Sequence, residues 1–245
     1  MTSKNCLGLL VRCFAAVSVL VSAAAQAQSG ITQYTAEYQA EYKGRNVGRA
    51  TFSVQQDAAS GNFIYSSETR AKGLLRLAAP NPVIDQSTFT VRGDAVVPLN
   101  FMHQDGSRKG DDNHQIAFDW DNNTARVQDE NGNHEIQLEP GVLDRGSLQV
   151  ALMRDFQRDD TPRTYKVADE DELSTYSFTY EGKHMLSTEL GEVAVERYAQ
   201  QRAGSSRRTL IDFAPDLGFV PVRIEQLRDG ESRSAFYIDS LDITE

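Results

Sequence analysis

Apolar and polar residues alternate with a period of two along most of this chain. Between Tyr34 and Tyr42 every second residue is Tyr or Ala, and Thr, Glu or Gln stands between them. The alternation resumes at Gly48 after a turn at residues 44–46. Because successive side chains of a strand point to opposite faces, this stretch predicts a β-hairpin with one buried face.

The same alternation predicts many further strands. They are expected at residues 63–70, 86–92, 99–104, 115–119, 125–128, 134–138, 163–167, 175–180, 183–190, 193–200, 207–213, 220–228 and 232–241. Turn residues separate these segments, and Asn131-Gly132 and Glu181-Gly182 are typical of tight hairpin turns. Such regular spacing predicts a mainly β protein with an antiparallel meander rather than alternating βαβ units.

One segment follows a helical period instead. Asp144 is a favourable N-cap, and Leu148, Leu152 and Phe156 follow it at helical spacing. The pattern predicts one amphipathic helix of about three turns.

Two connections are rich in proline. Residues 74–78 are mostly leucine and precede Pro80, which predicts a short helix or an apolar loop ended by proline. In residues 214–221, Pro215 favours the first turn position and Gly218 can adopt the left-handed conformation. The second stretch therefore predicts a hairpin connection near the open rim of the sheet.

The N-terminus has the pattern of an export signal. Lys4 and Arg12 precede an apolar run at residues 14–25, and Ala-Gln-Ala ends at Ala27. We expect residues 1–27 to be a signal peptide cleaved after Ala27, because the apolar run is shorter than the roughly 20 residues that span a bilayer. Both cysteines lie in this segment. Residues 28–245 are then a cysteine-free, single antiparallel β domain of the periplasm that does not span the membrane.

The charge of the expected mature chain excludes one class of partner. Removal of Lys4 and Arg12 leaves 23 basic and 35 acidic residues, a net charge of −12 with histidine neutral. Such a chain is repelled by nucleic acid unless it carries a local basic patch. Arg108-Lys109 and Arg207-Arg208 are the only basic clusters, and we interpret both as solvated turn charges.

Catalytic and metal-binding motifs are weak. No G-x-S-x-G motif is present, and Ser147 is expected on the helix surface. The histidines stand singly and are expected in exposed loops, although His103 and His114 flank a loop that contains Asp111 and Asp112. Residues 119–130 match several acidic positions of a calcium-binding loop, but Thr124 replaces its glycine and a β-hairpin explains the same residues. We therefore expect no cofactor, no metal and no catalytic residue.

Several segments together carry a resemblance to a known family. In order along the chain they are YTAEYQAEYKGRNVGRATFSV, GLLRLAAP, VVPLNF, LDRGSLQVALMRDF, LGEVAVERY and FAPDLGFVPVRIEQ. This series resembles the bacterial exported family called domain of unknown function 3108. The resemblance implies a fold similar to periplasmic lipoprotein carriers of the LolA and LolB type: a single curved antiparallel sheet, an open half-barrel, with one or two short helices against its concave side. It brings no catalytic residues with it.

The resemblance and the apolar pattern together suggest a function. We expect a non-enzymatic protein of the cell envelope that binds a lipid, an acyl chain or a lipidated partner in the concave face, with residues 74–78 as a lid. The residues expected to line this apolar site are Tyr34, Tyr38, Tyr42, Leu74, Leu75, Leu77, Leu148, Leu152 and Phe156. The first alternative is a scaffold with a packed interior that docks onto an envelope protein, and the second is an unrecognised hydrolase.

Overall fold

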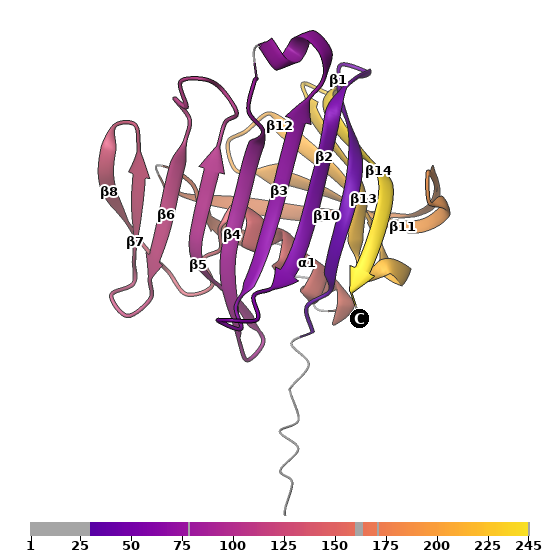
Figure 1. Ribbon diagram of the computed structural model, residues 1–245. Helices are drawn as coiled ribbons and strands as arrows, with labels where there is room; N and C mark the ends of the chain where they lie inside the picture. The colour runs from indigo at the N-terminus through magenta and orange to yellow at the C-terminus, as the bar shows by residue number, and fades with distance from the viewer. Residues whose placement is uncertain (1–29, 78, 160–163, 171, 245) are drawn as a thin grey trace, which may run out of the picture.

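The chain forms one antiparallel sheet in which consecutive strands are neighbours (Figure 1). The computed structural model describes residues 30–244 except 78, 160–163 and 171. The expected signal peptide and its cleavage site after Ala27 thus lie outside the described residues. The strand order is β8-β7-β6-β5-β4-β3-β2-β1-β14-β13-β12-β11-β10-β9, so the pairing of β1 with β14 joins two meanders.

Most strands have nearly the predicted bounds. They are β1 Gln33–Tyr42, β2 Arg45–Gln56, β3 Phe63–Ala71, β4 Val83–Arg92, β5 Ala95–Gln104, β6 His114–Asp119, β7 Thr124–Asp129, β8 Gly132–Gln137, β9 Thr164–Ala168, β10 Leu173–Thr188, β11 Gly191–Arg202, β12 Arg207–Ala214, β13 Val220–Arg228 and β14 Glu231–Thr244. The helix α1 is Arg145–Gln157, and two short 3₁₀ helices are η1 Gly73–Leu77 and η2 Pro215–Leu217.

The predicted hairpin turn at Glu181-Gly182 is wrong. Residues 173–188 form a single strand, β10, and its register with β11 shifts between Tyr180 and Gly182. The extra residue is accommodated as a β-bulge, which bends the strand without ending it. A bulge and a tight turn both favour glycine, and continuous pairing with β11 decides between them.

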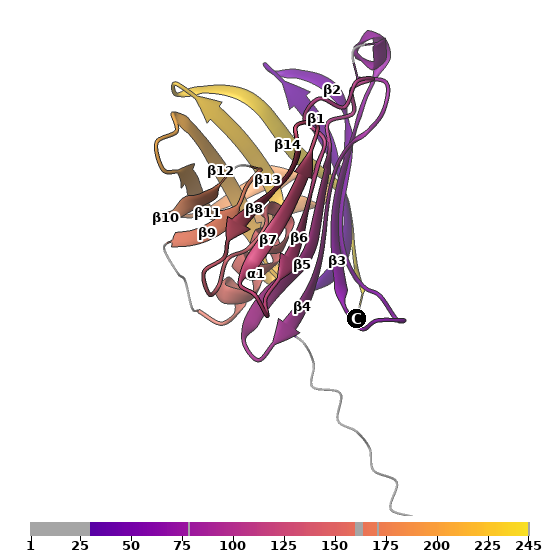
Figure 2. The ribbon, with the colours of Figure 1, turned by 90° about the vertical axis from the view of Figure 1, so that its left-hand side faces the viewer.

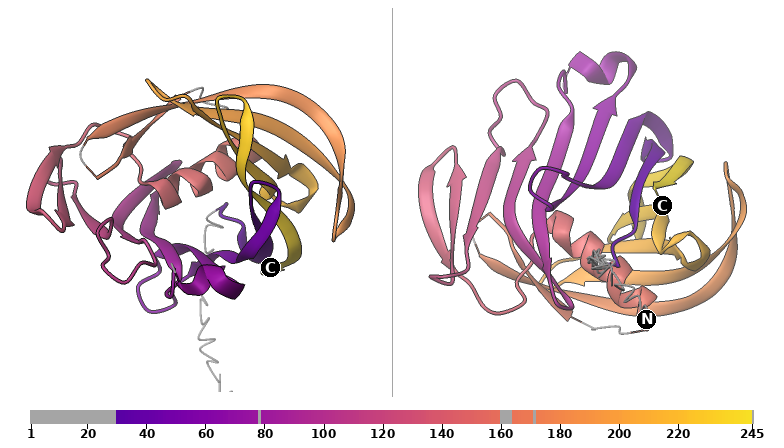
Figure 3. Two further views of the ribbon diagram at one scale, coloured as in Figure 1. Left: turned by 90° about the horizontal axis from the view of Figure 1, so that it is seen from above. Right: turned by 60° about the horizontal axis from the view of Figure 1, so that its bottom comes forward.

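The sheet curls until its two edges almost meet. Figure 2 shows the two meanders as facing walls, and Figure 3 shows them from above as a nearly closed ring around α1. The edge strands are β8 and β9. Leu143 forms a parallel bridge with Val167 of β9, and the His134 ring on β8 lies 2.8 Å from the Glu170 carbonyl oxygen. The fold is therefore a barrel-like antiparallel sheet, as the sequence predicted in outline.

The helix fills one end of this barrel. Asp144 caps it, and the capping carboxylate accepts the Ser87 hydroxyl proton from β4 at 2.7 Å. At the other end of α1, Gln157 donates to the Gly218 carbonyl oxygen at 2.8 Å. The predicted amphipathic helix had one buried face, but Val150 and Met153 on the face away from the predicted stripe are buried as well. The curled sheet surrounds α1 (Figure 3), and nine of the 13 residues of the helix are buried.

The proline-rich connection before β13 lies at this filled end, not at an open rim. It contains η2, and Gly218 has a φ of 66°, the left-handed conformation that the sequence predicted. Gln157 at the end of α1 covers it. Pro221 is the second residue of β13, and its carbonyl oxygen accepts the Tyr38 hydroxyl proton at 2.7 Å.

Candidate functional site

The inward side chains of β11, β12 and β13 change from apolar to basic along the barrel. In β12, Ile211 is buried in the core and pairs with Ile224 of β13. Two residues nearer the start of β12 the pair is Thr209 and Gln226, and two nearer still it is Arg207 and Arg228. Because alternate residues share one face, all three rows project into the barrel.

A pocket of about 690 Å³ lies at this basic end. Its lining residues are Arg145, Tyr176, Gln200, Arg202, Gly204, Ser205, Ser206, Arg207, Thr209, Gln226 and Arg228. We call it the arginine pocket. Most of its side chains can donate hydrogen bonds, and none of these described residues carries a carboxylate. This stands out in a chain with a formal charge of −10.

The four arginines share a single nearby acid. The Asp169 carboxylate lies 3.8 Å from Arg145 Nε and 3.5 Å from Arg202 Nη1. Arg207 and Arg228 form no ion pair with any described residue. Arg208 faces the other side of the sheet and is paired with Glu181. The placement of Arg207-Arg208 in a turn is thus wrong, because both residues belong to β12, although Arg207 is exposed at the start of the strand.

Arg145 is held in place by its neighbours on the opposite wall. Its guanidinium carbon lies 5.4 Å from the centre of the buried Phe101 ring, a cation–π contact. Its Nη2 lies 3.1 Å from His114 Nε2. Burial is the main cause that lowers the pKa of His114, so the ring is neutral at pH 7 and Nε2 can accept the arginine proton. The arginine therefore reaches the pocket with a fixed orientation.

The expectation of exposed loop histidines is wrong, because all four lie on strands and none is exposed. His103 and His114 lie on paired strands, and their ring centres are 5.2 Å apart. His103 Nδ1 is 2.6 Å from the Asp85 carboxylate. Even so, no group of three His, Cys, Asp or Glu side chains is placed to hold a metal ion in the described part of the chain.

The remaining weak motifs have structural explanations. Asp119 ends β6 and accepts the Asn122 backbone N–H at 3.1 Å in the turn to β7, so the calcium-like segment is a β-hairpin, as expected. Ser147 is not on the helix surface but fully buried. Its hydroxyl oxygen accepts the Asp144 backbone N–H at 2.8 Å, which completes the helix cap.

The residues predicted to line an apolar site fall into two groups. Tyr34, Tyr38, Leu148, Leu152 and Phe156 are buried in the core around α1. Tyr42, Leu74, Leu75 and Leu77 are exposed, with Leu74 at 85% and Leu77 at 71%. Neither group lines the arginine pocket. The structure brings the first group together by packing and leaves the leucines on η1, which projects from the rim in Figure 1.

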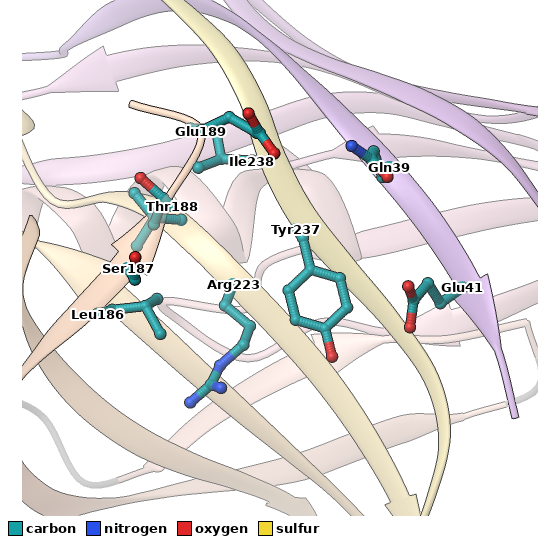
Figure 4. A pocket seen from close by; sticks show the side chains of 10 residues that line it. Gln39, Glu41, Leu186, Ser187, Thr188, Glu189, Arg223, Tyr237 and Ile238 are labelled. Carbon is teal, nitrogen blue, oxygen red and sulfur yellow. The ribbon is translucent and has the colours of Figure 1, made fainter. Parts of the chain in front are cut away.

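A second hollow, of about 480 Å³, lies on the outer face of the sheet. In Figure 4, Tyr237 projects from β14 between Arg223 and Glu41, and the end of β10 lies across from them. Arg223 Nε is 2.7 Å from the Asp212 carboxylate, which Arg197 also contacts at 2.8 Å. This arginine already has a partner, which makes the outer hollow the weaker candidate.

Sequence reasoning missed the arginine pocket, although a signal was present. Arg207 lies four residues before Ile211 and Arg228 lies four residues after Ile224. An even spacing from a buried strand residue predicts an inward position. The decisive fact is the cross-strand pairing of Arg207 with Arg228, which a single sequence does not contain.

The fold and the pocket define a class: a barrel-like antiparallel sheet nearly closed around one helix, with a basic pocket at its open end. The chain belongs to the family described as protein of unknown function (DUF3108), whose model matches residues 33–235. No curated protein matches it. In the described residues, no helix is long and apolar enough to cross a bilayer.

Two solved structures are similar to this chain. One is a beta-barrel-like protein of domain of unknown function DUF1849 from Brucella abortus, with a TM-score of 0.58, 8% identity and coverage of 88% of this chain and 99% of that one. The other belongs to the MucA/MucB complex of Pseudomonas aeruginosa, with a TM-score of 0.39, 9% identity and coverage of 89% of this chain and 54% of that one. At these identities the first likeness shows the fold alone.

Proposed function

We propose that this protein is a non-enzymatic, periplasmic protein of the cell envelope that binds a lipid or a lipidated partner at the open end of its concave face. The observation that carries the proposal is the arginine pocket, which remains open after α1 and the core have filled the other end. Its volume of about 690 Å³ is within the range typical of small-molecule sites. Export is supported by the signal-like pattern of the first 27 residues.

The polar lining changes the expected orientation of the ligand. An acyl chain gains nothing from contact with arginine and glutamine side chains, whereas a polar head group does. Strand pairing indicates that η1 and the pocket share one rim. Gly48 pairs with Ala71, which lies just before η1. Tyr42 pairs with Ser234 of β14, and Ser234 pairs in turn with Gln226 near the end of β13. We therefore place the head group in the pocket and the apolar part toward Leu74 and Leu77.

The experiment compares ligand retention in variants that fill the pocket or spare it. Thr209→Trp adds a large ring to the inward lining, and Thr51→Trp adds the same ring to an exposed outward position of β2. Native mass spectrometry of the exported protein should show a bound amphiphile in the wild type and in the Thr51 variant, but not in the Thr209 variant. Absence of any co-purifying amphiphile and of fluorescent fatty-acid uptake by the wild type would contradict the proposal.

A scaffold that docks onto an envelope protein is the second candidate. The observation that favours it is the exposure of Leu74 and Leu77, because apolar side chains left in solvent at a rim are typical of interaction surfaces. Cross-linking in cells should then trap an envelope protein at η1. Replacement of both leucines by serine should abolish the cross-link. On this hypothesis neither the wild type nor the variant retains an amphiphile.

A further inference from the structure

We propose that the arginine pocket is a phosphate site, in which Arg207 and Arg228 bind a phosphate group as its two principal ligands. The inference rests on the proposed function and names the chemistry of the head group. It begins with the pairing of two arginines directly opposite each other on neighbouring strands. Like charges in this position destabilise a sheet, so folding alone gives no reason for the pair.

Two further arginines add to the charge of the pair, and the acid opposite Arg228 in the register, Glu231 of β14, contacts Arg233. Arg145 and Arg202 also line the pocket, and Asp169 is the one acid within 4 Å of any of the four guanidiniums in the described chain. Four guanidinium charges against one carboxylate leave a net charge of +3, and among the described residues Arg207 and Arg228 have no ion-pair partner. A phosphate monoester carries about −1.5 to −2 at pH 7, which compensates more of this charge than a single carboxylate does.

The other lining groups fit an acceptor-only ligand. Tyr176, Thr209 and Ser206 offer hydroxyl groups, and the glutamines on β11 and β13 offer amide N–H groups. Burial is the main cause that raises the pKa of Tyr176, so its hydroxyl keeps its proton, which it donates to Asp169 at 3.5 Å before a ligand binds. Arginine is suited to phosphate because its planar guanidinium can donate two parallel hydrogen bonds.

Arg145 contributes a charge whose position is set before the ligand arrives. His114 accepts one of its N–H groups and the Phe101 ring covers its guanidinium. A cation fixed in this way loses little side-chain entropy on binding. The site therefore combines one fixed arginine with two unpaired ones at the strand ends.

The test measures binding by calorimetry at fixed salt for three probes: inorganic phosphate, dihexanoyl phosphatidic acid below its micelle concentration, and dihexanoylglycerol. The variants are Arg207→Gln and Arg228→Gln. Arg92→Gln is the matched control, because Arg92 also has no ion pair among the described residues and ends β4 at the opposite rim. Thermal unfolding without ligand shows whether each variant folds, and we expect the two pocket variants to melt no lower than the wild type.

The expected result is that phosphate and phosphatidic acid bind, and that each pocket variant weakens both by about tenfold or more while the control does not. Equal weakening by the control, or no binding of either phosphate-bearing probe, overturns the phosphate site. If dihexanoylglycerol binds as tightly as phosphatidic acid and the variants change nothing, amphiphile binding stands and the phosphate site fails. If phosphatidic acid binds no tighter than phosphate, the phosphate site stands and the lipid proposal fails.

Discussion

Asp144 provides a test of how burial and helix capping compete at one carboxylate. It is fully buried and accepts the backbone N–H groups of Gly146 and Ser147, both at 2.8 Å, besides the Ser87 hydroxyl. Burial raises its pKa to about 6 despite these hydrogen bonds. We predict that Asp144→Asn stabilises the protein at pH 7 relative to the wild type, because asparagine keeps the capping acceptor without a buried charge.

The magnitude follows from the pKa difference between the folded and unfolded states. The unfolded value is 3.8, so the native protein binds more protons than the unfolded chain between about pH 4 and pH 6. The contribution of Asp144 to wild-type stability therefore falls as the pH rises through this window. At 1.36 kcal/mol per pKa unit, the loss is about 3 kcal/mol by pH 7. The asparagine variant does not titrate and does not suffer this loss.

The assay is urea unfolding of both proteins at several pH values between 4 and 7.5. The free energy of unfolding of the variant minus that of the wild type should grow with pH, and Asp111→Asn in an exposed loop controls for the loss of one negative charge. A difference that stays constant across the window refutes the reasoning. A difference that shrinks as pH rises would mean that the helix terminus and its hydrogen bonds outweigh burial.

Three further predictions concern packing and are checked by urea or thermal unfolding. Gly146→Ala should destabilise by about 1–3 kcal/mol although alanine favours helices, because its Cβ would lie 2.7 Å from the Tyr65 ring; a stabilised variant would show that the ring moves freely. Phe156→Ala should cost about 3–5 kcal/mol, since the ring stacks on Tyr198 at 4.2 Å, and a loss below 1 kcal/mol would argue against the packed end of the barrel. Gly218→Val should lower the melting temperature without changing ligand retention, because φ is 66° at this position.

Local sequence patterns were enough to predict most elements of this fold. The period of two predicted β13 at residues 220–228 with the bounds that the structure has, and Asp144 was identified as the helix cap. Both features depend on neighbouring residues only. The bulge at Gly182 depends on a partner strand, and glycine after a polar residue is equally typical of a turn. The predicted turn at this position was wrong because the sequence does not show which strand β10 pairs with, although glycine itself was read correctly as a residue that interrupts a regular strand.

The burial of α1 shows a second limit of local reasoning. The sequence pattern gave one apolar stripe, which is what a helix needs when it lies against one sheet. Closure of the sheet through β1 and β14 surrounds the helix, so Val150 and Met153 on its other side are buried too. A single sequence does not state how far a sheet curls, and the number of buried helix faces follows from that curvature.

The gradient along three adjacent strands separates the structural end of the barrel from the end that we assign to a ligand. From the packed end to the open end, the inward residues are Tyr198, Gln200 and Arg202 in β11, Ile211, Thr209 and Arg207 in β12, and Ile224, Gln226 and Arg228 in β13. A sheet that only packed a core would end in small polar or alternating charges at its rim, since facing like charges cost stability. All three strands end in arginine at the same level instead. A feature that destabilises the fold and is repeated across neighbouring strands is best explained by a bound anion that compensates the charge.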